Sequence, residues 1–234
     1  MNIRYSIFTL QMLAYLSIIP MIIFASWWQW IIALLMYFVL NGLGMIMTYH
    51  RLLTHRSFKC PKWLEYLFTF ITTFSFTGSS ITWIAIHRKH HKYADTEKDP
   101  HSPDHKGRFK VHFLTMFAKV SPRFAMDLIR NKFYLFQRKY YFIIIGMSAT
   151  ILFLIDPFAI VYAWLFPAFL TIFFGTLILS TSHRDGKPHD DFILGILTWG
   201  DAFHHTHHEK PMQNRLHKYD ISGWIIETFF KVKA

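Results

Sequence analysis

The sequence predicts an all-α integral membrane protein: four transmembrane helices, arranged as two hairpins, and a cytoplasmic helical cap that contains a histidine-rich site. Three observations lead to this fold class. Two long stretches lack charge, lysine and arginine are segregated outside them, and all 15 histidines fall in the charged regions. Because the 234 residues contain no internal repeat and no flexible linker, we expect a single domain over 1–234.

Both uncharged stretches are long enough for two membrane crossings. Residues 5–49 contain no Asp, Glu, Lys, Arg or His, and Asp156 is the only charged residue in 140–182. One crossing takes about 20 apolar residues, so we expect two helices in each stretch. The WWQW run at 27–30 is typical of a membrane surface, and Asp156-Pro157 is typical of a tight turn. The predicted spans are about 6–26, 30–50, 140–155 and 158–182.

The distribution of positive charge predicts the orientation. Of the 25 Lys and Arg residues, 17 lie in 50–139, seven lie in 184–234 and one is Arg4. Positive residues accumulate on the cytoplasmic side of membrane proteins. We therefore expect both termini in the cytoplasm, with a cap formed by 51–139 and 183–234, in a bacterial inner membrane or the endoplasmic reticulum. The net charge of +11 follows from this bias and would also attract anionic lipid or an acidic redox partner.

Residues 63–86 would also pass as a membrane helix by hydropathy. A single crossing there would place the histidines before it and after it on opposite faces of the membrane, where they could not share a site. We therefore expect this segment to lie in the interface or to dip into the membrane and return, with a bend at Gly78-Ser79-Ser80. We favour the interfacial form.

The histidines form clusters with the spacing of metal ligands. In HRKHH (87–91) they stand three and four residues apart, so one turn of helix directs all three to one side. The segment HHTHH (204–208) repeats the H-x-x-H-H spacing. His50 and His55 are five residues apart, about 140° on an ideal α-helix. We expect these two to approach different sides of a site or two different metals. His183 follows the fourth predicted helix.

Nine clustered imidazoles are too many for one zinc ion, which takes three or four ligands, and they suit a di-metal site with positions left open for oxygen or water. Imidazole fits zinc, copper, iron or nickel, so the residue types leave the metal open. A zinc-protease motif is absent because Met212 stands where its second histidine is needed. Haem between the helices is disfavoured because no histidine lies inside a predicted span. The histidines expected to be solvated or locally hydrogen-bonded are His101, His105, His112, His189 and His217.

At these residues the sequence resembles the membrane-bound fatty-acid desaturases, specifically the delta-9 branch that acts on acyl-CoA or acyl-lipid. HRLLTHRSFK is similar to the first histidine box, HRKHHKYADTEKDPHSP to the second with its extension, and GDAFHHTHHEKP to the third. The likeness runs from about Gly42 to Pro211, and three boxes in order are far more specific than one. It implies an oxygen-dependent di-iron centre with these ligands: His50, His55, His87, His90, His91, His183, His204, His207 and His208.

The chain departs from the family pattern at four positions. Leu179 stands where the family often has an Asn that holds a water on one iron, and the hydroxyls of Ser180 and Thr181 are candidates to replace it. We expect His205 either to support the site from outside the ligand set or to lie on the surface. In the third box, the residues that differ from the usual Asn, Glu and Gly are His205, Asp201 and Ala202.

The resemblance implies that an oxidant derived from O2 removes hydrogens from adjacent carbons to leave a cis double bond, a reaction beyond any side-chain acid or base. The expected partners are a fatty acyl-CoA or acyl-lipid substrate, membrane lipid and an external electron donor such as ferredoxin or a cytochrome b5-like protein, with no nucleic acid. Trp83 and Thr77 are candidate walls of a substrate tunnel, although Trp83 is equally an interfacial anchor. The candidates to orient the imidazoles are Asp95, Asp99 and Asp201.

Two other functions compete with desaturation. A di-iron membrane hydroxylase of a lipid or alkane would use the same boxes, although the HRLLTHRSF and DPHSP surroundings favour desaturation. A non-enzymatic metal-binding membrane protein would need polar ligands within its spans, and the predicted spans are nearly bare. The sequence therefore favours an oxidoreductase, a fatty acyl desaturase, with the lipid hydroxylase as its alternative.

Overall fold

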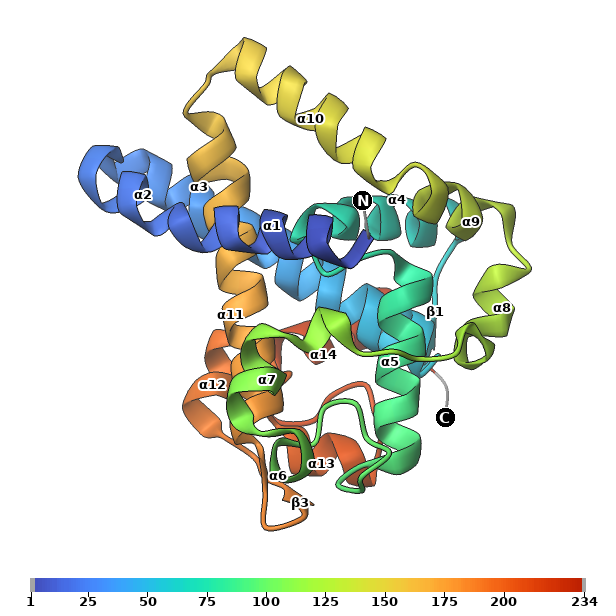
Figure 1. Cartoon of the computed structure of the whole chain (residues 1–234). Helices are drawn as coiled ribbons and strands as arrows, with labels where there is room; N and C mark the ends of the chain where they lie inside the picture. Colours follow the sequence, from blue (N-terminus) through green and yellow to red (C-terminus); the bar gives the residue numbers. More distant parts are fainter. Residues whose placement is uncertain (1–2, 233–234) are drawn as a thin grey trace.

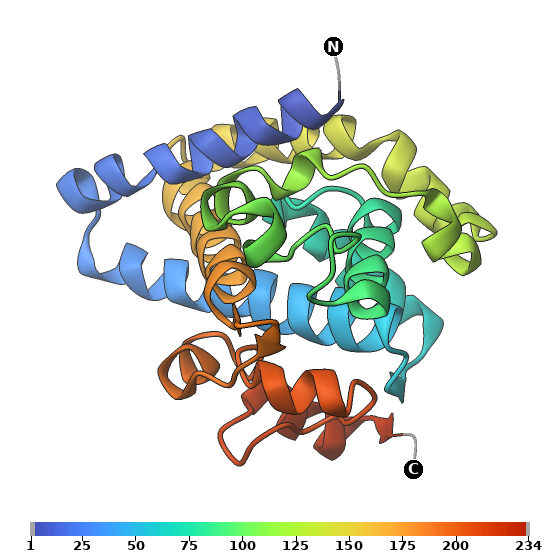
Figure 2. The same ribbon diagram turned by 60° about the horizontal axis from the view of Figure 1, so that its bottom comes forward.

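The computed structural model describes residues 3–232 and consists mainly of helices. The long apolar helices lie toward the top of Figure 1 and many of the short ones toward the bottom, and Figure 2 shows the same arrangement turned. The apolar helices are α1 (Ile3–Leu16), α2 (Ile18–Phe24), α3 (Trp27–Tyr37), the π-helix η1 (Phe38–Thr54), α10 (Tyr141–Ile155), the π-helix η5 (Ile160–Leu165) and α11 (Phe166–Thr181).

These pieces make three helices that are long and apolar enough to cross a membrane: Ile3–Phe24, Trp27–Thr54 and Ile160–Thr181. A fourth crossing arises if α10 is joined to α9 (Lys132–Lys139), from which it bends by 65°. The protein is therefore a membrane protein with three or four candidate spans, where the sequence predicted four. The 15 residues of α10 alone fall short of the hydrocarbon thickness.

The breaks between the apolar helices have local causes. The first lies at 25–26, just before the tryptophans rather than among them, because Ser26 begins α3 in a capping box with Gln29. The second lies at Asp156-Pro157, as predicted, where the Asp156 carboxylate accepts from the backbone N–H of Phe158 at 2.9 Å. The second span also continues to Thr54, so His50 lies one turn inside it instead of at its end.

The segment from Lys62 to Tyr93 is broken into two helices. Helix α4 (Lys62–Thr72) and the 3-10 turn η2 (Thr73–Ser75) precede the break, and α5 (Ser80–Tyr93) follows it. Phe76 and Gly78 have positive φ angles of 57° and 91°, and glycine adopts this conformation without strain. Among residues 3–232 the candidate spans do not include this segment. The break, residues 76–79, overlaps the position predicted for the bend at Gly78-Ser79-Ser80, and α5 runs from it to the histidines of η1.

The remaining elements are short. The helices are α6 (Pro103–Lys106), α7 (Arg108–Phe113), η3 (Thr115–Phe117), η4 (Pro122–Ala125), α8 (Met126–Ile129), α12 (Phe192–Leu197), α13 (His204–Glu209) and α14 (Ile221–Phe229). Two antiparallel strand pairs complete the fold: β1 (Phe58–Lys59) with β4 (Lys231–Val232), and β2 (His183–Arg184) with β3 (Lys187–Pro188). The β1–β4 pair joins the chain after η1 to the chain after α14.

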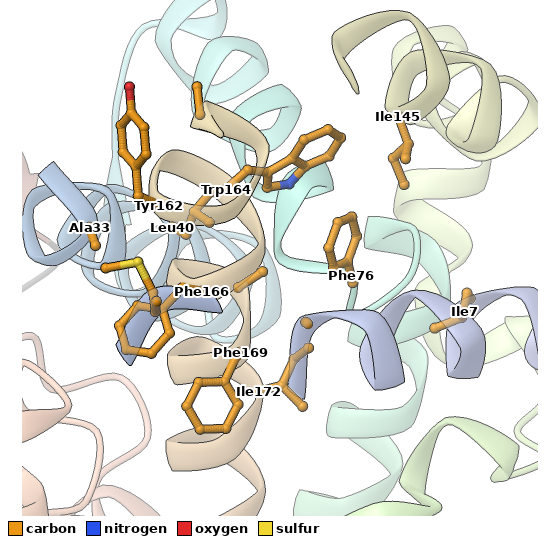
Figure 3. Close-up of a cluster of buried hydrophobic side chains, with 14 of the residues drawn as sticks. Ile7, Ala33, Leu40, Phe76, Ile145, Tyr162, Trp164, Phe166, Phe169 and Ile172 are labelled. Atoms are coloured by element: carbon orange, nitrogen blue, oxygen red, sulfur yellow. The ribbon is translucent and has the colours of Figure 1, made fainter. Parts of the chain in front are cut away.

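The apolar core lies where α1, α3 and α11 meet (Figure 3). Ile7 of α1, Ala33 of α3 and Phe169 of α11 are buried in one cluster. The indole N–H of Trp164 in η5 donates to the carbonyl of Phe74 at 2.8 Å, which attaches this helix to the chain after α4. In a bilayer, close packing and hydrogen bonds of this kind hold helices together, because lipid is as apolar as the side chains.

Two arginines attach the end of η1 to the short elements. Arg51 is fully buried and donates to both carboxylate oxygens of Asp220, at 3.2 and 2.9 Å. Arg88 of α5 donates to the carbonyl of Leu53 at 2.6 Å and to Asp127 at 2.7 Å. These contacts fix η1, α5 and the segment before α14 relative to one another, and these are the elements around the histidines.

Candidate metal centre

All nine histidines that the resemblance implied as ligands converge in two groups, contributed by η1, α5, α13 and the residues that follow η1 and α11. Within each group, one ring nitrogen from each residue lies within 4.8 Å of the others. The five-histidine group consists of His50, His55, His87, His91 and His207, and the four-histidine group of His90, His183, His204 and His208. Each H-x-x-H-H motif is therefore divided between the two groups.

His50 and His55 share one side because the helix before His55 is a π-helix. In η1 each amide bonds to the carbonyl five residues back, and the His55 amide donates to the His50 carbonyl at 3.1 Å. The Thr54 hydroxyl likewise donates to the carbonyl five residues back, that of Tyr49, at 2.8 Å. Residue i+5 consequently lies over residue i, and the two imidazole centroids are 4.9 Å apart. The alternative that these histidines approach two different metals assumed an α-helix and is wrong, since both belong to the five-histidine group.

Three aspartates each hold one imidazole. The pairs, with the distance from Nδ1 to the carboxylate, are His50 with Asp201 (2.7 Å), His90 with Asp99 (2.9 Å) and His183 with Asp95 (2.8 Å). Because a carboxylate only accepts, the proton of each neutral ring lies on Nδ1 and the lone pair lies on Nε2. The three aspartates named from sequence proximity thus contact histidines of both groups.

The Nε2 lone pairs of these rings face other imidazole nitrogens, an arrangement that suits a shared cation. His50 Nε2 lies 2.8 Å from His207 Nε2, and His183 Nε2 lies 2.9 Å from His204 Nε2. Metal–nitrogen bonds of about 2.0–2.1 Å would place neighbouring ligand nitrogens roughly 3 Å apart. His55 Nε2 is buried without a hydrogen-bond partner within residues 3–232. The donor set therefore fits two metal ions.

Burial lowers the pKa of most of the clustered rings. The pKa of His91 falls to about 2, first because the ring is buried and then because neighbouring imidazoles would repel its charge. The pKa values of His87, His204 and His207 are lowered for the same two reasons. At neutral pH these imidazoles are unprotonated, which is the form that binds a metal ion.

A narrow cavity joins both groups to the apolar helices. It has a volume of about 100 Å³, and its lining includes His50 and His87 of the five-histidine group and His204 of the four-histidine group. Trp83 and Thr77, the two tunnel residues named from sequence, both line it, and Trp83 stacks on His87 with ring centroids 4.7 Å apart. Apolar residues of η1 and α11 complete much of the wall, among them Met45, Ile46 and Ile172.

The positions that depart from the family pattern lie around this site. His205 is half exposed, with its imidazole 3.4 Å from Glu209, so of its two expected positions the structure gives the surface one. Leu179 lines the cavity. The hydroxyls of Ser180 and Thr181 both donate to the carbonyl of Leu177 in their own helix, at 3.1 and 2.7 Å, and the Ser180 hydroxyl also lies 3.4 Å from His112 Nδ1.

Sequence reasoning missed His101. It was expected to be solvated or locally hydrogen-bonded, but its side chain is buried and its ring centroid lies 5.6 Å from that of His90. The signal that could have found it is Asp99, two residues earlier, whose carboxylate accepts from the His101 backbone N–H at 2.8 Å. Of the other histidines set aside, His105 is exposed, whereas the partly buried ones are His112, His189 and His217.

The fold and the site define a class of protein: a membrane protein with a two-part histidine metal site beside an apolar cavity. Comparison with known proteins gives the family. The family model described as Fatty acid desaturase matches residues 25–221. The chain therefore belongs to the fatty acid desaturase family.

Individual relatives agree with this assignment. The chain is 31% identical to an sn-1 stearoyl-lipid 9-desaturase of Synechocystis sp., over 96% of this chain and 74% of that protein. It is 32% identical to Delta-9 acyl-lipid desaturase 2 of Arabidopsis thaliana, over 88% of this chain and 73% of that protein. It is also 30% identical to an Acyl-CoA C20 Delta5-desaturase of Anemone leveillei, over 87% of this chain and 69% of that protein.

Proposed function

We propose that this desaturase introduces a cis double bond at the delta-9 position of a fatty acyl chain, using O2 and two iron ions held by the nine clustered histidines. The observation that supports it most is the cavity, whose walls are largely apolar and whose lining includes histidines of both groups. Two relatives named as 9-desaturases support the delta-9 position. A relative named as a Delta5-desaturase makes the delta-5 position the competing one. The same names support an acyl-lipid or acyl-CoA substrate.

Iron, when bound, supplies from O2 the oxidant that an unactivated methylene requires. The reaction balances as one CH2–CH2 unit, one O2, two electrons and two protons giving one CH=CH unit and two waters. His50 with its four neighbours would hold one ion, and His90 with its three neighbours would hold the other. Asp201 and Asp99 keep the Nδ1 proton of these two rings in place, so that Nε2 stays available to the metal.

The residues of the cavity would position the acyl chain. Ile46 and Ile172 offer apolar contact from two different helices, and Trp83, stacked on His87, forms a rigid wall beside the five-histidine group. Such walls would hold one pair of carbons against the metals and exclude water, so that the oxidant meets C–H bonds instead of solvent.

The site also bears on topology. His55 follows the span Trp27–Thr54 and His183 follows the span Ile160–Thr181, yet their rings lie in adjacent groups. With both rings on one face of the membrane, the chain would cross once between these spans, which supports a crossing by α9 and α10 and a layout of two hairpins. The 24 Lys and Arg residues in 50–139 and 184–234 support a cytoplasmic cap and cytoplasmic termini.

An external donor would supply the electrons. The positive charge of the proposed cap suits an acidic protein such as a ferredoxin or a cytochrome b5-like donor.

The test is expression in a host that lacks unsaturated-fatty-acid synthesis and contains a compatible donor, followed by mass spectrometry of total acyl chains with the double bond located. We expect a new delta-9 monounsaturated chain from the wild type and from the control His205→Ala, and none from His90→Ala. Hydroxylated acyl chains would show that the protein is a lipid hydroxylase instead of a desaturase. Unchanged acyl chains from cells whose purified protein holds two irons would overturn the proposal.

A further inference from the structure

We propose that His101 is a positioning residue that holds a water molecule against the metal of the four-histidine group. The inference rests on the metal centre proposed above and adds one residue to it. It starts from an asymmetry, because one group offers five imidazoles and the other offers four. The second metal thus has one protein ligand fewer, and a position is left for water.

His101 is fixed in one orientation beside the four-histidine group. The residue is 5% exposed, and its backbone N–H donates at 2.8 Å to Asp99, the carboxylate that also holds His90 at 2.9 Å. Its Nδ1 lies 2.8 Å from the Thr115 hydroxyl. The Asp99 carboxylate thus fixes both the His90 ring and the backbone of His101. Thr115 fixes the rotation of the His101 ring.

The second nitrogen of this ring is left for a ligand. Within residues 3–232, His101 Nε2 makes no hydrogen bond, and His101 lines the cavity together with His204 of the four-histidine group. His101 is not among the residues whose donor atoms lie within 4.8 Å of one another, so the geometry favours a bridging water over a direct bond to metal. The cavity of about 100 Å³ has room, since one water takes about 30 Å³.

The hydrogen bonds of the ring suit this role. A neutral imidazole has a single N–H. With the Thr115 hydroxyl donating to Nδ1, that N–H lies on Nε2 and donates to the water oxygen. The water then has the metal and His101 as partners. Leu179, on the same cavity wall, contributes no polar atom.

The experiment is a titration of the full-length, purified apoprotein with Co²⁺, followed by its visible absorption, whose intensity rises as the coordination number of cobalt falls. We expect two Co²⁺ per wild-type chain. In His101→Leu one of the two should bind about 10- to 100-fold more weakly and absorb more strongly, as for the loss of other outer partners of a metal ligand. His101→Gln, which keeps a donor, and Leu179→Asn in the His101→Leu background should restore the wild-type spectrum.

His112→Gln is the matched control, because His112 is a partly buried histidine in contact with Ser180 and outside both groups. Its affinities and spectrum should equal those of the wild type. A His101→Leu protein with wild-type affinity and spectrum would overturn the inference. If His101→Leu does not fold, Thr115→Val must show the one-site spectral change, and an unchanged spectrum overturns the inference. A wild type that binds fewer than two Co²⁺ would instead contradict the metal centre itself.

Discussion

Replacing each of the three aspartates that hold imidazoles by asparagine should lower the affinity of one metal site and leave the other unchanged. Asp201 contacts His50 of the five-histidine group, whereas Asp99 and Asp95 contact two members of the four-histidine group. Asparagine keeps the shape but removes the charge that fixes the Nδ1 proton. Asp201→Asn should therefore lower the affinity for the metal ion of the five-histidine group. Asp99→Asn and Asp95→Asn should both lower the affinity for the metal ion of the four-histidine group.

The magnitude follows from burial. Loss of such a partner typically costs about 10- to 100-fold in metal affinity, or about 1.4–2.8 kcal/mol. The side chains of Asp99, Asp95 and Asp201 are 0%, 12% and 23% exposed, and water screens the more exposed charges. Asp99→Asn should lie at the upper end of the range and Asp201→Asn at the lower end. Asp99 also accepts from the backbone of Asp95 at 3.1 Å, which adds to its effect.

The assay is competition with a chelator, monitored by Mössbauer spectroscopy of protein loaded with ⁵⁷Fe, in which the two sites give separate signals. The control is Asp190→Asn, an exposed carboxylate that contacts Thr206 and no histidine of either group. Loss of the same signal in Asp201→Asn and Asp99→Asn would refute the division of the ligands. Wild-type affinity in all three variants would refute the role of the carboxylates.

Three further predictions concern stability, the substrate cavity and pH. Asp220→Asn leaves the buried Arg51 uncompensated and should cost about 3–5 kcal/mol in denaturant unfolding. Much of this loss should be recovered in Arg51→Met/Asp220→Asn, because asparagine still has an oxygen that can accept from the backbone N–H groups of Leu216 or Gly223; equal losses in both proteins would contradict this. Gly175→Phe should abolish product formation while both irons remain bound. A Cβ at Gly175 meets nothing within 4 Å, so the phenyl ring would enter the cavity. Unchanged turnover would contradict this. The lowered pKa values of His91 and His101, about 2 and about 4, mean that the unfolded apoprotein binds more protons below about pH 6.5. Its Tm should be level above that pH and fall as the pH drops from about 6.5 toward 4, and a rise on acidification would contradict the burial of these rings.

The membrane helices could be predicted because uncharged stretches of this length suit a bilayer. Their details depend on contacts that periodicity does not reveal. Ser26 and Gln29 set the start of α3 before the tryptophans, and α10, which matches the third predicted span, bends by 65° from α9. The π-helical form of η1 was also missed, because its sequence has no feature that separates i→i+5 from i→i+4 bonding.

The histidine spacing identified which side chains gather but not how they divide. On an α-helix the direction of a side chain turns by about 100° per residue, so neighbours such as His90 and His91 point to different groups. Asp99 could be named because it is close in sequence to the second box. The contact between His101 and Thr115 could not, because Thr115 reaches this ring through the fold rather than through a sequence pattern.

The central claim is that two irons lie side by side, each within one histidine group, and the most direct measurement is anomalous diffraction at the iron absorption edge from crystals of the purified protein. The account predicts two iron peaks, one enclosed by the group of His50 and His207 and the other by the group of His90 and His208. A single peak, or peaks that respond only at the zinc edge, would contradict it.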